Sequence, residues 1–146
     1  MREIKFRART VNGKWLYGNL QVPSVNGVPY YMWDEDKFQC PVDENTIGQY
    51  TGLKDKNGKE IYEGDIVKFN YTSKNYKGSS SIPYKVTCVC VYDEPSGRFI
   101  YKRLSSNSKK LSRNWMSKGV GSFEIDNVEI IGNIHDNPEL IKEEEK

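Results

Sequence analysis

The chain has 146 residues and a formal net charge of +2 at pH 7, with 36% hydrophobic and 29% charged residues. This length fits one domain or two small subdomains and excludes a large multidomain assembly. Ten tyrosines, five phenylalanines and three tryptophans supply many large, partly polar rings, which favour half-buried β surfaces over a wide helical core.

The sequence predicts no targeting or membrane-spanning segment. Charges interrupt any apolar segment near the N-terminus, at Arg2, Glu3, Lys5, Arg7 and Arg9. No apolar run elsewhere approaches the roughly 20 residues that a membrane-spanning helix needs. An odd number of cysteines cannot form a self-contained disulfide framework, and this chain has three, Cys40, Cys88 and Cys90. We therefore expect reduced thiols in a cytoplasmic protein.

The first 45 residues predict a β-meander. The opening strand alternates between an apolar and a basic face, formed by Ile4, Phe6 and Ala8 and by Lys5, Arg7 and Arg9. Residues 15–22 and 28–33 read as the next two strands. Asn-Gly favours two-residue type I′ hairpin turns, and it occurs between strand-like segments at Asn12-Gly13, Asn26-Gly27 and Asn57-Gly58. We expect residues 1–45 to form an N-terminal hairpin or meander subdomain.

Residues 46–146 predict a second β subdomain. Glycines separate the short strands expected in its first part, at Gly48, Gly52, Gly58 and Gly64. The Gly64-Asp65 turn enters an apolar strand, as at the opening of many small SH3-like barrels. Residues 84–92 are nearly apolar on both faces, which predicts a central strand.

The end of the chain predicts one long loop, a last strand and a short helix. A turn at 94–97 leads into a returning strand at 99–104. Residues 105–122 are too polar to order by themselves, so they read as a loop that is functional or mobile. Residues 128–134 read as the closing strand. Asn137 and Pro138 supply an N-cap and a first helical residue, and predict a short helix to about residue 144.

Three blocks of the sequence resemble the YopX family of phage and prophage proteins of Gram-positive bacteria. They are residues 4–8, residues 46–67 and residues 131–140, in the expected order along the chain. Arg9 stands where the family usually has tryptophan, and residues 70–121 depart freely from the family pattern. The resemblance implies a β-rich fold with an SH3-like barrel and a bacterial host cytoplasm. It implies no established activity, and it assigns no catalytic or ligand-binding residue.

The residues that could hold a metal do not form a known ligand set. His135 is the only histidine, which favours a structural or solvent-exposed role. Cys88 and Cys90 would share one strand face, but Cys40 lies in an unrelated turn, so all three read as small hydrophobic side chains. Two acidic clusters, at 34–36 and 43–44, could hold a divalent cation; solvated turns are the favoured interpretation, because no Asp-x-Asp-x-Asp-Gly loop surrounds them.

No catalytic motif is present either. The chain lacks a phosphate-binding P-loop, a nucleophile elbow, a His-Glu-x-x-His helix and a dinucleotide fingerprint. We therefore predict a protein that is not an enzyme and needs no metal or cofactor. An enzyme with an unrecognised active site remains an alternative.

The charges are distributed unevenly along the chain. Lys and Arg number nine against ten Asp and Glu in residues 1–66, eleven against two in residues 67–119, and two against eight in residues 120–146. Basic residues interleaved with aromatic ones are typical of nucleic-acid surfaces. The candidates for such a surface are Tyr101, Lys102, Arg103, Lys109, Lys110, Arg113, Trp115 and Lys118.

A solvated basic loop accounts for the same charges. Its charge would keep the loop soluble, and the acidic tail at 143–145 could fold back over it. Trp115 could equally attach the loop to the core.

A third interpretation is a module that binds a protein partner or associates with itself. Small β folds present edge strands and loops to partners, and tyrosine-rich surfaces suit such contacts. Alternation places Tyr31 and Trp33 on the face opposite to Tyr30 and Met32, so one of these faces is core and the other could be an anchor. We favour this interpretation, with nucleic-acid binding as the alternative and no membrane contact.

Overall fold

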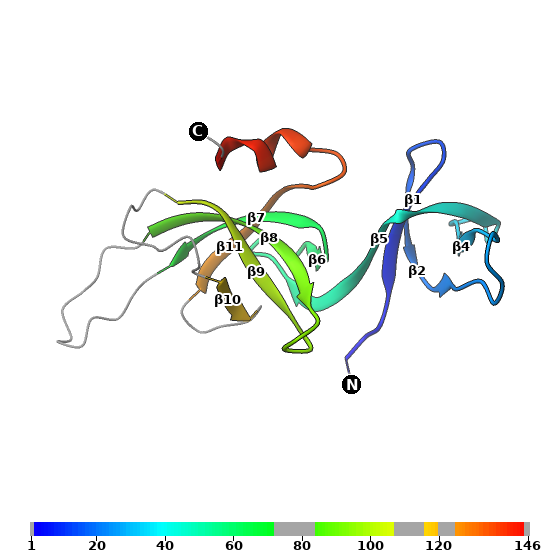
Figure 1. The fold of residues 1–146 in the computed structure, drawn as a ribbon, viewed down its shortest axis with the longest axis horizontal. Helices are drawn as coiled ribbons and strands as arrows, with labels where there is room; N and C mark the ends of the chain where they lie inside the picture. The colour runs from blue at the N-terminus through cyan, green and yellow to red at the C-terminus, as the bar shows by residue number, and fades with distance from the viewer. Residues whose placement is uncertain (1, 72–83, 107–115, 120–124, 145–146) are drawn as a thin grey trace. The chain divides into compact units, whose positions relative to one another are not determined.

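The computed structural model describes residues 2–71, 84–106, 116–119 and 125–144 (Figure 1). These residues form eleven β-strands and one 3₁₀ helix, so the prediction of a mainly β chain is confirmed. The chain divides into two compact units, Met1–Gly52 and Leu53–Lys146. Strand β5, Gln39–Lys54, runs through both this boundary and the predicted one after residue 45.

The N-terminal unit is an antiparallel sheet in which a long strand occupies the centre. Its strands are ordered β2-β1-β5-β4-β3. The others are β1 (Phe6–Thr10), β2 (Trp15–Gly18), β3 (Leu20–Gln21) and β4 (Tyr30–Trp33). The hairpins β1–β2 and β3–β4 form as expected. The meander is interrupted, because β5 is long enough to pair with both β1 and β4 and lies between them.

One face of this sheet forms the core of the unit. Its buried side chains are Ala8, Leu16, Met32 and Val42. Strands β2 and β4 contact each other although β1 and β5 separate them in the strand order, so the sheet curls around this apolar face. Burying these side chains together supplies the hydrophobic stabilisation of the unit.

The burial of Arg7 differs from the predicted division of β1 into a buried apolar face and an exposed basic face. Its side chain is only 5% exposed, although it points away from the core. The guanidinium carbon of Arg7 lies 5.0 Å from the centre of the Trp15 ring, and that of Arg9 lies 5.9 Å from the same ring. The indole therefore covers the cation by a cation–π contact, which the alternation of polar and apolar residues does not reveal.

The three Asn-Gly turns form hairpins of a different type from the one predicted. The glycines have positive φ angles, 85° at Gly13, 85° at Gly27 and 81° at Gly58. The asparagines before them do not, and a type I′ turn needs positive φ at both central residues. In the first turn the Gly13 amide bonds to the Thr10 carbonyl and the Thr10 amide to the Lys14 carbonyl. This pattern is a type I turn closed by a left-handed glycine.

The C-terminal unit contains a five-stranded antiparallel sheet in the order β10-β9-β8-β7-β11. Its strands are β7 (Asp65–Tyr71), β8 (Tyr84–Asp93), β9 (Arg98–Ser106), β10 (Met116–Gly119) and β11 (Ile125–Asn133). A sixth short strand, β6 (Glu60–Tyr62), pairs with β5. The predicted central position of residues 84–92 is confirmed. Among the described strands the sheet does not close into a barrel, and β10 lies inside the stretch predicted as a loop.

Apolar side chains cover both faces of this sheet. The larger cluster contains Ile61, Val67, Phe69, Val86, Cys88, Cys90, Phe99 and Tyr101. On the other face Ile134 and Leu140 pack against Ile66, Val89 and Leu104. Leu140 belongs to the 3₁₀ helix η1 (Pro138–Glu144), drawn in red along the sheet in Figure 1. The predicted C-terminal helix is thus present in 3₁₀ form, and its role is to cover the second face.

The described part of the chain has no helix that is both long and apolar enough to cross a membrane. None of the three cysteines, all of which the structure describes, forms a disulfide. Cys88 and Cys90 are fully buried on the larger cluster and act as small hydrophobic side chains, as predicted.

Candidate binding surfaces

The segment at 132–137 is a structural turn built by asparagine side chains. The Asn133 side-chain oxygen accepts hydrogen bonds from the backbone amides of His135 and Asp136, at 3.0 and 2.9 Å. The Asn137 side-chain oxygen accepts one from the Asn133 amide at 3.3 Å and packs directly over Gly132. His135 is half-buried within this turn, which agrees with a structural role. The turn directs η1 back over the sheet.

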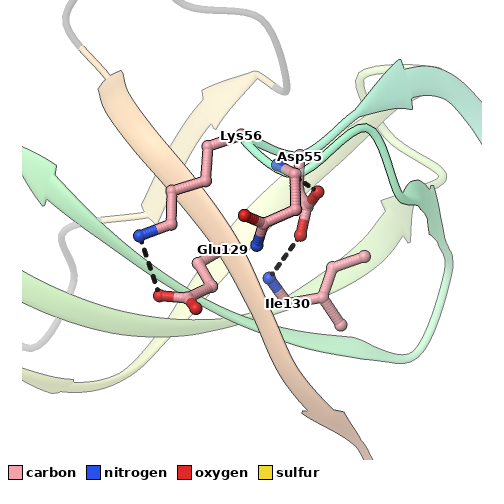
Figure 2. Close-up of polar contacts among 5 residues, drawn as sticks. Asp55, Lys56, Glu129 and Ile130 are labelled. Atoms are coloured by element: carbon pink, nitrogen blue, oxygen red, sulfur yellow. Dashed lines mark hydrogen bonds and ion pairs between the residues drawn. The ribbon is translucent and has the colours of Figure 1, made fainter.

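The middle block of the sequence is joined to the last strand by Asp55 (Figure 2). One carboxylate oxygen accepts bonds from the backbone amides of Asn57 and Lys59, at 2.8 and 2.9 Å, and shapes the turn between β5 and β6. The other accepts a bond from the Ile130 amide on β11 at 3.1 Å. Beside it, the Lys56 ammonium lies 3.1 Å from the Glu129 carboxylate.

The environment of Asp55 favours its ionised form. The side chain is 8% exposed, and this burial on its own raises the pKa. The three backbone hydrogen bonds and the nearby Lys59 charge more than offset burial, so the pKa of Asp55 lies below its ordinary value of 3.8. A carboxylate held by backbone amides in this way stabilises a fold rather than transferring protons at neutral pH.

The carboxylates of the two acidic clusters also stabilise turns by accepting hydrogen bonds from backbone amides. Asp34 accepts a hydrogen bond from the Phe38 amide at 2.9 Å, and Asp43 accepts one from the Asn45 amide at 3.0 Å. In the part of the chain that the structure describes, no group of three or more His, Cys, Asp or Glu side chains is arranged to hold a metal ion.

An open depression lies beside the turn between β3 and β4. Its volume is about 350 Å³, and Gly27, Val28, Pro29, Tyr30, Val42 and Glu44 line it. Glu44 is the carboxylate in this lining. The lining does not bring together a nucleophile, a base and an oxyanion donor, which is the arrangement that an acyl-transfer site needs.

The β4–β5 hairpin of the N-terminal unit carries exposed apolar side chains. Trp33 and Phe38 are 43% and 69% exposed. Tyr31 lies opposite Pro41, and Trp33 lies opposite Gln39, so these side chains continue one surface across the two strands. We call Tyr31, Trp33 and Pro41 on this surface, together with Phe38 in the turn at the end of the same hairpin, the hairpin patch. Met32, between the two aromatic residues, is fully buried, so the predicted division of this strand into two faces is confirmed.

A family model described as "YopX protein" matches residues 5–142. The chain belongs to the YopX family. A similar solved structure is the crystal structure of protein EF1440 from Enterococcus faecalis. It shares 25% sequence identity with this YopX chain at a TM-score of 0.54, and the match covers 97% of this chain and 100% of that one. No curated protein matches.

Family membership confirms the resemblance carried by the three sequence blocks. The structure brings two of these blocks together, because the Asp55 turn bonds to Ile130 and the Ile134 amide bonds to the Gly64 carbonyl at 2.9 Å. The YopX blocks thus specify how β11 and η1 join the sheet.

The candidate nucleic-acid residues divide into four groups. Tyr101 is 1% exposed in the core, so its ring is not available for stacking on a base, and burial raises the pKa of its hydroxyl. Lys102 is exposed on β9, and Arg103 beside it is half-buried. Lys118 lies on β10, of which the backbone is described. The remaining candidates, Lys109, Lys110, Arg113 and Trp115, lie outside the described residues.

Two exposed lysines that the sequence did not single out lie on the same sheet as Lys102. Lys68 is on β7 and Lys85 is on β8. They belong to the basic middle segment, whose charge count gave the only sequence signal for them. The cross-strand register, which the sequence does not provide, determines which of these lysines share a face.

Proposed function

We propose that this YopX protein is a non-catalytic assembly module, which associates with a second copy of itself through the hairpin patch of its N-terminal unit. We further propose that it acts in the cytoplasm of a bacterial host of a phage or prophage, which the family resemblance supports. The single observation that carries the association is the exposure of Trp33 and Phe38 on one hairpin. Tryptophan and phenylalanine are the side chains that most stabilise protein interfaces when they become buried.

A second copy is the occupant that the chemistry of the patch favours. Its four members carry no charge, and Gln21 and Gln39 beside them are neutral amides that hydrogen-bond to each other. Two identical patches can therefore face each other about a twofold axis with no charged side chain among the members of the patch. Each contact of such a twofold dimer occurs twice, so even a small patch buries the aromatic rings of both copies.

Sedimentation velocity over a range of protein concentrations tests this proposal. We expect the wild type to shift from monomer to dimer as its concentration rises. Trp33→Ser and Phe38→Ser remove the rings and should keep the protein monomeric at concentrations where the wild type is dimeric. Neither side chain belongs to the core cluster of the unit, so circular dichroism should report an unchanged fold.

The matched control is Val11→Ser. Val11 is 79% exposed in the turn between β1 and β2, outside the hairpin patch, and its loss should leave the dimer intact. A wild type that stays monomeric at every concentration contradicts the proposal, as does a dimer that survives both ring removals.

A further inference from the structure

Glycine follows three asparagines of the chain, Asn12, Asn26 and Asn57, and the structure describes all three pairs. The backbone nitrogen of the glycine can attack the side-chain carbonyl carbon of the asparagine, because glycine has no side chain to obstruct ring closure. The attack forms a succinimide ring as the carbon–nitrogen bond of the carboxamide breaks and ammonia leaves. Water then opens the ring at either carbonyl and yields aspartate or isoaspartate. The whole reaction is a deamidation that needs no enzyme.

The hydrogen bonding of the glycine amide controls this reaction in a folded chain. The nitrogen must lose its proton and move toward the carboxamide. A hydrogen bond from the N–H to a carbonyl opposes both steps, since it must break first. A nearby negative charge opposes them too, because the nitrogen becomes negative as it loses its proton. The three asparagines should therefore react at rates that depend on their turns.

The turn at Asn12 uses its glycine amide as a hydrogen-bond donor. The Gly13 amide donates to the Thr10 carbonyl at 2.9 Å. The Thr10 amide donates to the Lys14 carbonyl at 2.9 Å, and the Lys14 amide donates to the Thr10 hydroxyl at 3.1 Å. The Gly13 nitrogen can attack only after this network opens locally, so the turn protects Asn12.

The turn at Asn57 is held by a charged group as well. The Gly58 amide donates to the Asp55 carbonyl at 3.0 Å. The Asp55 carboxylate accepts hydrogen bonds from the amides on both sides of Gly58, those of Asn57 and Lys59, at 2.8 and 2.9 Å. The pKa of Asp55 is lowered, so this carboxylate is negative at neutral pH. Hydrogen bonding and charge both protect Asn57.

The turn at Asn26 places its glycine differently. Its turn residues are 26 and 27, whereas those of the other two turns are 11–12 and 56–57 and precede the glycine. A β-turn is closed by the amide that follows its two central residues, and Gly13 and Gly58 occupy that position. Gly27 is itself a central residue, with the positive φ angle, 85°, of a type II turn. Its amide is therefore not the donor that closes the turn, and residues 24–29 are all exposed to water.

We infer that Asn26 is a site of spontaneous deamidation in the folded protein, and that the turns at Asn12 and Asn57 protect their own asparagines. The product lowers the formal net charge of +2 by one. Gly27 lines the depression beside β3 and β4 together with Glu44, so the new carboxylate adjoins a surface that is already acidic. The inference does not depend on self-association, because residues 22–29 include no member of the hairpin patch.

Peptide mapping by chromatography and mass spectrometry tests the inference. The protein is incubated at mildly alkaline pH, and the rate of conversion at each asparagine is compared between the folded chain and the chain unfolded in urea. The three sites should react at similar rates in urea, because each precedes glycine. Folding should slow Asn12 by about fivefold and Asn57 by more than about tenfold, since neutral and charged hydrogen bonds must break there. Asn26 should stay within about twofold of its unfolded rate.

The matched variants are Asn26→Gln and Asn12→Gln, because glutamine has to close a larger ring and reacts much more slowly. Isoelectric focusing after incubation of the folded proteins should show much less of the acidic form in Asn26→Gln than in the wild type. Asn12→Gln should form as much of it as the wild type. Equal conversion at the three sites of the folded chain overturns the inference. So does a folded Asn26 that reacts as slowly as Asn57, or an acidic form that Asn26→Gln does not reduce.

Discussion

The Asp55 carboxylate accepts a hydrogen bond from the Ile130 backbone amide across a sequence separation of 75 residues. The same side chain shapes the turn between β5 and β6, so one residue orders a local hairpin and attaches the last strand to it. We predict that Asp55→Ala lowers the free energy of unfolding by about 3 kcal/mol, because three backbone amides lose a charged acceptor. Urea unfolding measures this difference. Asp36→Ala, at an exposed position, should leave stability unchanged.

The lowered pKa of Asp55 predicts how this contribution depends on pH. The folded chain keeps the carboxylate ionised under acidic conditions that protonate it in the unfolded chain. Its stabilisation is therefore fully present above the unfolded pKa and is lost as the pH falls through the lower folded value. We expect the stability gap between wild type and Asp55→Asn to be constant from about pH 7 to about pH 5 and to shrink below about pH 4. A gap that widens on acidification contradicts this assignment.

Gly132 is predicted to tolerate no side chain. A Cβ atom there would collide with the carboxamide of Asn137, which is held by the Asn133 amide. Gly132→Ala should lower the free energy of unfolding by about 1 to 3 kcal/mol through this overpacking. In an Asn137→Ala background the same change should cost less, and a double-mutant cycle by urea unfolding measures the coupling. Additive effects would show that the collision is not the cause.

Salt is predicted to strengthen self-association through the hairpin patch. Glu35 and Asp36 are exposed in the turn of the β4–β5 hairpin, so two facing copies would bring like charges near each other. Screening should then strengthen self-association as ionic strength rises. Glu35→Gln/Asp36→Asn should strengthen the dimer at low salt in sedimentation experiments. Glu94→Gln, in the exposed turn after β8, is the control and should have no effect.

Local chemistry predicted much of the fold. Asn-Gly pairs located three hairpins, and the apolar run at 84–92 identified the central strand of its sheet. The predicted type of turn was wrong, because a longer hairpin loop needs a positive φ angle only at its glycine.

Long-range pairing is what the sequence could not provide. The insertion of β5 between β1 and β4 depends on which strands meet, and the burial of Arg7 depends on Trp15 arriving from the next strand. Tyr101 shows the same limit for the candidate site. It stands between Ile100 and Lys102, and its place on the buried face of β9 emerges only when β8 and β7 pair beside it.

Two-dimensional NMR spectra over a dilution series test self-association through the hairpin patch most directly, because they report both association and the residues involved. We predict concentration-dependent shifts that centre on Tyr31, Trp33 and Phe38 and disappear in the Trp33→Ser variant. Spectra that do not change with concentration would contradict the proposed assembly. Shifts that centre on another surface of the chain would contradict the assignment of the hairpin patch.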